Sequence, residues 1–231
     1  MPPDLHGVPS AVLFDMDGTL VDTEDLWWAA CVEVALGLRS PLAQGDRQAL
    51  FGLPVEDAAV LVSGKVAGGP GPRVVEAMLT RAFTERIESG VTTLPGAIAL
   101  LEALGAAGVP AGLVSASPRP VVDMVLDTVG GHRFRLSVAA GDSARNKPAP
   151  DPYLAAAGRL GVDPSSCVAI EDSPTGIASA RAAGCAVIAV GLDPAAVPEG
   201  VVTVPTLESV DLRLLRLLVA GAGNNAHGGG G

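Results

Sequence analysis

One pattern constrains the fold more than any other: short apolar runs alternate with helical patterns along the chain. The apolar runs cover residues 8–15, 109–116, 135–142, 166–172 and 185–191. Each is nearly continuous in hydrophobicity, as expected of parallel strands buried on both faces. The helical patterns between them cover residues 95–108, 118–130, 150–161 and 173–184. We therefore predict an α/β fold built on a doubly wound parallel sheet with right-handed crossovers.

The alternation is interrupted once, directly after the first apolar run. Residues 22–93 show helical periodicity and no good strand, with helices expected over 22–38, 55–66 and 73–88. An insertion at this point lies over the carboxyl edge of the sheet, where open α/β sheets bind ligands. We therefore expect a small all-helical cap or lid, with hinges near residues 20–23 and 90–95.

These patterns divide the chain into three parts. Residues 8–21 and 94–219 form the predicted α/β catalytic core, and residues 22–93 form the helical cap. The glycine-rich segment 220–231, which ends in GNNAHGGGG, is expected to be a disordered tail.

Composition and charge exclude several classes of function. The chain has 231 residues, 48% of them apolar, which is ample for a sizeable core. Its net charge of −10 argues against binding to nucleic acid or to an anionic membrane. No apolar run reaches the roughly 18 residues of a spanning helix, and we expect no secretory signal before the first strand. We expect a cytoplasmic protein, and the three cysteines in apolar surroundings fit buried free thiols.

Polar residues that could carry chemistry stand at or just after the ends of the predicted strands. They are Asp15, Asp17, Ser115, Lys147, Glu171 and Asp172. A parallel sheet brings such positions to one edge, so four carboxylates, one hydroxyl and one ammonium converge there. Clustered carboxylates repel one another unless a cation neutralises them, and an all-oxygen ligand set favours a hard cation such as Mg²⁺. A lysine and a serine beside such an ion suit a phosphate group.

Four motifs carry a family resemblance. DMDGTLVDT, the serine after the second strand, the lysine of NKPAPDPY, and EDSPTGI occur in this order. Together they resemble the haloacid dehalogenase-like hydrolase superfamily over roughly residues 8–195. The helical insertion after the first motif resembles the cap of the branch that contains β-phosphoglucomutase and the sugar phosphatases.

The resemblance implies a role for each motif residue. Asp15 would be the nucleophile and Asp17 the general acid and base. Ser115, Ala116 and Lys147 would hold the transferring phosphoryl group, and Gly18 would allow the tight turn that brings backbone N–H groups toward it.

The resemblance also implies a bound Mg²⁺ ion as cofactor. Its ligands would be Asp15, Asp172 and the backbone carbonyl of Asp17, with Glu171 acting directly or through water.

Two departures from the family pattern narrow the activity. Asp17 is present, whereas haloacid dehalogenases lack this second aspartate, so dehalogenation is disfavoured. Trp27 stands where β-phosphoglucomutase has a histidine, and GLPVED at residues 52–57 lacks the arginine with which the mutase holds a second phosphate. DTEDLWW instead resembles a segment of the hexitol- and 2-deoxyglucose-phosphate phosphatases. We therefore expect a monomeric phosphatase of a small phosphorylated metabolite, a sugar or polyol phosphate.

Alternatives stay open at this point. A phosphomutase of the β-phosphoglucomutase type is one, and a non-catalytic protein that binds phosphorylated ligands is another. The candidate substrate contacts in the cap are Trp27, Gly52 and Leu53. Trp27 and Trp28 equally fit core packing of a cap helix, but at helical spacing they point about 100° apart, so one can pack while the other faces a substrate.

Overall fold

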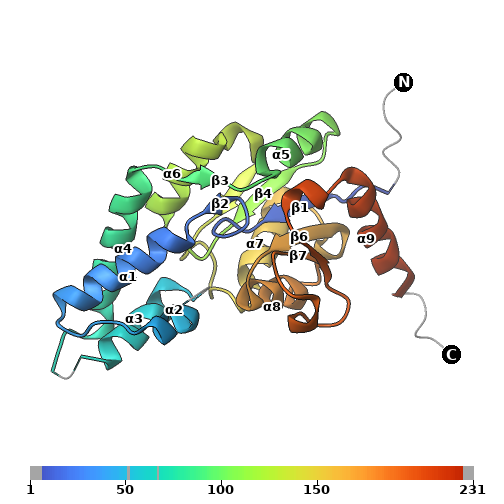
Figure 1. Ribbon diagram of the computed structural model, residues 1–231. Helices are drawn as coiled ribbons and strands as arrows, with labels where there is room; N and C mark the ends of the chain where they lie inside the picture. Colours follow the sequence, from blue (N-terminus) through green and yellow to red (C-terminus); the bar gives the residue numbers. More distant parts are fainter. Residues whose placement is uncertain (1–6, 51–52, 67, 226–231) are drawn as a thin grey trace.

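The framework of the molecule is a six-stranded sheet in the order β5-β4-β1-β6-β7-β8, in which every neighbouring pair is parallel. This computed structural model describes residues 7–50, 53–66 and 68–225, with side chains described as far as residue 220 (Figure 1). The strands are β1 Ala11–Phe14, β4 Ala111–Val114, β5 Leu136–Val138, β6 Cys167–Glu171, β7 Ala186–Val190 and β8 Val202–Val204. All five predicted strands are present, and β8 is an additional short strand at one edge.

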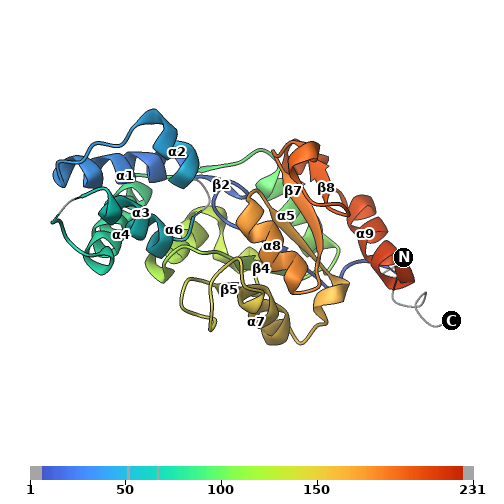
Figure 2. The same cartoon turned by 90° about the horizontal axis from the view of Figure 1, so that it is seen from below.

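Helices cover both faces of the sheet, which confirms the predicted doubly wound α/β fold. They are α5 Ala97–Ala106, α6 Arg119–Val129, α7 Asp151–Leu160, α8 Pro174–Ala182 and α9 Leu212–Asn225. Figure 2 shows α5 and α7 on opposite sides of the strands. On β1, Val12 and Phe14 belong to the apolar cluster that includes α5, α6 and α9, whereas Ala11 and Leu13 belong to the cluster with α7 and α8. Both sides of each central strand are therefore buried, which is why its sequence is continuously apolar.

Four helices form a separate group beside the sheet (Figure 1). They are α1 Glu24–Gly37, α2 Gln44–Leu50, α3 Val55–Gly64 and α4 Pro72–Glu88, and α4 packs against both α1 and α3. Three of them match the helices expected in the insertion. The exception is α2, whose sequence QGDRQAL has no apolar stripe and buries only Leu50.

The two connections between these helices and the sheet are paired with each other. β2 Val21–Asp22 and β3 Thr92–Thr93 form an antiparallel ladder in which Val21 lies opposite Thr93. The N–H of Leu94 also donates to the carbonyl of Leu20 at 2.9 Å. The sequence predicts hinges here and no strand, because two-residue strands leave no periodicity to detect. The pairing means that the two connections cannot move independently.

The carboxyl-terminal helix is longer than the sequence predicts. α9 continues to Asn225 and so includes residues 220–225, which sequence analysis assigned to the disordered tail. The helix is anchored by Leu215, which is fully buried, and such packing supplies most of the stability of a helix in a protein. Residues 226–231 lie outside the described part of the chain.

Short 3₁₀ helices complete the chain, and the cysteines are buried. The 3₁₀ helices are Gly131–Arg133, Pro164–Ser166, Pro194–Ala196 and Leu207–Ser209.

Cys31, Cys167 and Cys185 are free thiols, and burial raises their pKa values to about 12, 11 and 12. Among the residues that the structure describes, no helix is both long enough and apolar enough to cross a membrane.

Candidate active site

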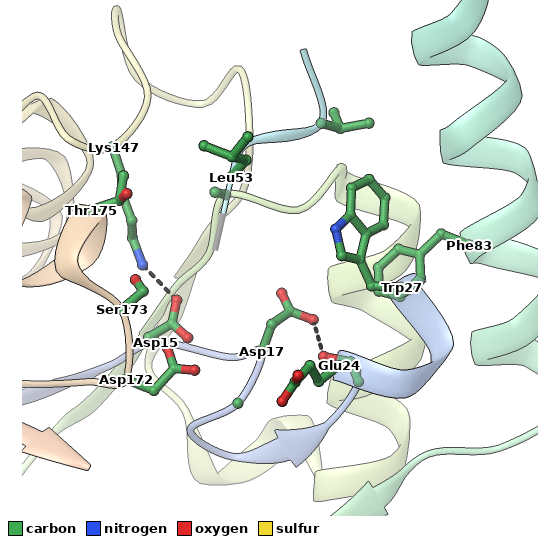
Figure 3. Close-up of a pocket in the computed structure, with 14 residues that line it drawn as sticks. Asp15, Asp17, Glu24, Trp27, Leu53, Phe83, Lys147, Asp172, Ser173 and Thr175 are labelled. Atoms are coloured by element: carbon green, nitrogen blue, oxygen red, sulfur yellow. Dashed lines mark hydrogen bonds and ion pairs between the residues drawn. The ribbon is translucent and has the colours of Figure 1, made fainter. Parts of the chain in front are cut away.

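A cavity lies between the carboxyl edge of the sheet and the cap helices (Figure 3). Its volume is about 110 Å³, several times the roughly 10–15 Å³ that one water molecule needs. Asp15, Asp17, Lys147 and Asp172 lie on its core side, and Trp27 faces them from the cap. The space therefore suits a small molecule that contacts both the sheet edge and the cap.

Lys147 connects the motifs at the floor of the cavity. Its Nζ donates to Asp15 Oδ1 at 2.6 Å, to Glu171 Oε1 at 2.7 Å and to the carbonyl of Val114 at 2.9 Å. Burial by itself would lower the pKa of this lysine, but the charges of Asp15 and Glu171 outweigh burial and raise it. The ammonium therefore stays charged and holds the end of β1 to the ends of β4 and β6.

Three carboxylates form a cluster that fits a metal ion. Asp15, Glu171 and Asp172 each offer an oxygen, and these oxygens lie within 4.8 Å of one another. Burial, followed by the charges of Asp15 and Glu171, raises the pKa of Asp172 well above its usual value. No described residue donates a hydrogen bond to Asp172, and Lys147 alone cannot balance three carboxylates. This excess of negative charge on an all-oxygen donor set fits a hard divalent cation.

Asp17 lies beside this cluster but has different partners. Its Oδ1 accepts a hydrogen bond from Thr23 Oγ1 at 2.7 Å, and its Oδ2 accepts one from Ser117 Oγ at 2.8 Å. Burial, and next the charge of Asp15, raises the pKa of Asp17. Two aspartates only two positions apart thus occupy distinct environments. The sequence pattern does not predict the contacts that Thr23 and Ser117 make with Asp17.

Ser115 and Ala116 follow β4 at the edge of the sheet. Ser115 is buried; its Oγ accepts the Ser117 N–H at 2.9 Å and lies 3.4 Å from Asp17 Oδ2. Ala116 lines the cavity, whereas Ser115 is not among the described lining residues. No described residue accepts a hydrogen bond from the Ala116 N–H, so this donor remains available to a ligand.

Gly18 and Gly176 provide room for the carboxylates. Gly18 has φ +77°, and a Cβ atom there would lie 1.9 Å from Asp172 Oδ2. Its own N–H donates to the carbonyl of Val21 at 2.9 Å. At Gly176, a Cβ atom would lie 1.9 Å from Glu171 Oε2. Any larger residue at either position would displace an acidic side chain of the cluster.

Glu171 has a further buried partner that sequence analysis missed. The hydroxyl of Tyr153 donates to Glu171 Oε1 at 2.5 Å, and Ser173 Oγ lies 3.3 Å from Oε2. Burial, followed by the charge of Glu171, raises the pKa of Tyr153 well above its usual value, so the phenol remains a donor. Tyr153 ends the NKPAPDPY motif, but the motif alone does not indicate which way its side chain points.

The cap side of the cavity is mostly apolar. Trp27, Leu53, Val55 and Phe83 line it. The Trp27 indole N–H donates to the carbonyl of Leu50 at 3.2 Å, and its ring meets the edge of Phe83 with centroids 5.3 Å apart. Trp28 is half-buried and packs against the main apolar cluster.

Of the three candidate cap contacts, Trp27 and Leu53 therefore line the cavity. The third, Gly52, lies outside the described residues.

Comparisons with known proteins identify the family of the chain. The family described as haloacid dehalogenase-like hydrolase matches residues 12–190. Hexitol phosphatase A of Escherichia coli (strain K12) is 36% identical over 220 residues, which covers 87% of this chain and 88% of the relative. Phosphoglycolate phosphatase of Shigella dysenteriae serotype 1 (strain Sd197) is 33% identical over 205 residues, or 79% of each protein.

Solved structures show the same fold. A crystal structure of β-phosphoglucomutase from Clostridium difficile superposes with a TM-score of 0.81 and 22% sequence identity, covering 92% of this chain and 98% of that one. The family resemblance drawn from the four motifs is thus confirmed by sequence and by fold. The chain is an enzyme of the haloacid dehalogenase-like hydrolase family.

Proposed function

We propose that this enzyme is a Mg²⁺-dependent phosphatase that hydrolyses a small phosphorylated metabolite, a sugar or polyol phosphate, through an aspartyl-phosphate intermediate. The observation that carries the proposal is the contact of Lys147 with Asp15 at the floor of a small cavity, beside the Asp172 carboxylate. The names of the relatives support it, since both are phosphatases of small molecules.

The reaction we propose has two steps, each a displacement at phosphorus. An oxygen of Asp15 attacks the phosphorus in line, the P–O bond to the alcohol breaks, and the Asp17 carboxyl gives its proton to the departing oxygen. Asp17 then takes a proton from a water molecule, which attacks the phosphorus of the aspartyl phosphate. The bond to Asp15 breaks, and inorganic phosphate leaves.

The phosphoryl group needs donors and positive charge. We assign these roles to Lys147, to the free N–H of Ala116 and to Ser115 at the end of β4. Asp15, Asp172 and the Asp17 carbonyl would hold Mg²⁺, with Glu171 acting directly or through water. When bound, the ion would neutralise charge on the phosphate oxygens.

A phosphomutase is less well supported. Such an enzyme must hold a second phosphate group while the intermediate turns over. None of the described cap residues that line the cavity is a lysine or an arginine. Analysis of the products from a hexose 1-phosphate distinguishes the two activities: we expect free phosphate, and an isomer without free phosphate would favour the mutase.

The proposal is tested by phosphate release from a panel of phosphorylated sugars and polyols. We expect turnover with Mg²⁺, loss of turnover with a chelator, and a fall of at least about 10³-fold in Asp15→Asn. Asp127→Asn, on the exposed face of α6, is the matched control and should behave as wild type. Undiminished activity in Asp15→Asn would contradict the proposal.

We also propose that the enzyme acts as a monomer in the cytoplasm, as the sequence predicts. Light scattering at micromolar concentration measures the mass directly. A stable dimer would contradict the monomeric part of this proposal.

A further inference from the structure

The two sides of the cavity differ in charge. On the core side, Lys147 supplies positive charge beside Asp15. The cap side is formed by Thr23, Glu24, Trp27, Leu53, Val55 and Phe83. Four of these are apolar, one carries a hydroxyl and one a carboxylate. Lys147 is the single cation among the described lining residues, and it lies at the opposite end.

The apolar part of the cap side is held in place. The Trp27 indole N–H already donates to the carbonyl of Leu50. The indole therefore offers a ligand its ring surface and no hydrogen-bond donor. Phe83 supports this ring at an interplanar angle of 78°. A rigid aromatic surface of this kind packs against the C–H faces of a sugar or polyol chain.

Glu24 places negative charge next to this surface. Glu24 and Trp27 project from the same end of α1 (Figure 3). Glu24 Oε1 lies 3.1 Å from Arg47 Nη2, but this nitrogen also binds Asp25 at 2.6 Å. One guanidinium is therefore shared by two carboxylates, and the group keeps a net charge of −1. Arg47 is not among the residues that line this cavity.

These features determine which chemical groups a substrate can have at the end that lies away from its phosphate. A hydroxyl group would donate a hydrogen bond to the Glu24 carboxylate while its carbon chain packs on Trp27. A second phosphate or a carboxylate would meet Glu24 and an apolar wall, and none of the described cap residues that line the cavity is a cation that could replace its lost hydration.

We propose that Glu24 and the Trp27 wall make the enzyme selective for phosphate esters of uncharged polyhydroxy alcohols, and that they reject esters with a second anionic group. This inference rests on the proposed phosphatase function. It makes Glu24 a specificity-determining residue of that reaction.

Matched pairs of esters test the selectivity. Sorbitol 6-phosphate and 6-phosphogluconate differ only at C1, where a CH₂OH is replaced by a carboxylate. Glycerol 3-phosphate and 3-phosphoglycerate form the corresponding shorter pair. We expect kcat/KM with Mg²⁺ to favour the neutral member of the better-used pair by at least about 100-fold.

A variant pair isolates the role of Glu24. Glu24→Gln keeps the shape of the side chain and removes its charge, and we expect it to reduce the preference by about tenfold, through better use of the carboxylate ester. Glu85→Gln removes the same charge from cap helix α4, at a side chain that is 60% exposed, does not contact Arg47 and does not line the cavity. This control should keep the preference within about twofold of wild type.

The outcomes separate the two proposals. Comparable use of both members of a pair, or an unchanged preference in Glu24→Gln, would overturn the selectivity while leaving the phosphatase function intact. Phosphate release from none of the four esters would overturn the proposed function, and the selectivity with it.

Discussion

The ammonium nitrogen of Lys147 lies 2.6 Å from Oδ1 of Asp15, and both side chains are buried although 132 positions separate them in the sequence. Asp15 directly follows the central strand β1, and Lys147 lies in the loop before α7. Their contact gives the buried Asp15 carboxylate a positively charged partner and holds it in place. It also joins strand β1 to the loop that carries the third motif.

Replacing this lysine should damage both stability and activity. Lys147→Ala leaves Asp15 and Glu171 buried without their cation, and we expect the free energy of unfolding to fall by about 3–5 kcal/mol in the absence of Mg²⁺. We expect kcat/KM for phosphate release to fall at least about 10³-fold. Denaturant titration and initial rates measure the two effects.

The only other lysine of the chain provides the control. Lys65 pairs with Asp46 at 2.8 Å on the surface, and its replacement by alanine should cost at most about 1 kcal/mol. Equal behaviour of the two alanine variants would contradict the role assigned to Lys147.

One hydrogen bond links the cap directly to the lysine loop. Asn146 Nδ2, on the residue before Lys147, donates to Glu56 Oε1 in the first turn of α3. Asn146→Ala should loosen the cap and raise KM about threefold or more, because the cap supplies one wall of the cavity. Steady-state kinetics measure the change.

A double-mutant cycle shows whether that bond is responsible. Asn146→Ala and Glu56→Ala should be non-additive, with a coupling of about 1 kcal/mol or more in kcat/KM. Asp57→Asn, at the exposed neighbouring position, should show no coupling with Asn146. Additive effects of the first pair would show that the bond contributes nothing to catalysis.

Asp142 should make stability depend on pH. Burial by itself would raise its pKa, but the Ala139 N–H and the charge of Arg119 outweigh burial and lower it. Its contribution is therefore fully present above the unfolded pKa of about 3.9, and it is lost as pH falls through the lower folded value.

The charge-neutral variant tests this dependence. Asp142→Asn should lower the free energy of unfolding by about 1 kcal/mol at pH 7, and the difference from wild type should shrink toward pH 3. Urea denaturation between these two pH values provides the measurement. A difference that does not change with pH would show that the charge of Asp142 is not involved.

The sequence predicts the sheet and the position of the motifs because both follow from local patterns. Continuous apolar runs identify the buried strands, and parallel strands bring Asp15, Ser115 and Asp172 to one edge. The cap helices α1, α3 and α4 also follow from their periodicity. The sequence does not predict α2, whose seven residues form no apolar stripe, or the two-residue strands β2 and β3, which exist only through their pairing.

Contacts between distant side chains are the part that local patterns cannot supply. Tyr153 reaches Glu171 because α7 packs beneath β1 and β4, and Thr23 reaches Asp17 because the chain turns back at Gly18. The spacing of Trp27 and Trp28 indicates that the two rings diverge. The structure is needed to show that Trp27 is the one that lines the cavity.

Covalent catalysis by Asp15 is the central step of the proposed reaction. The decisive measurement is an acid quench, within the first turnover, of the Mg²⁺-loaded enzyme with a ³²P-labelled polyol phosphate. We predict labelled protein that loses its label to hydroxylamine, as an acyl phosphate does, and no labelled protein in Asp15→Asn. Phosphate release without labelled protein, or equal labelling of Asp15→Asn, would contradict the central claim.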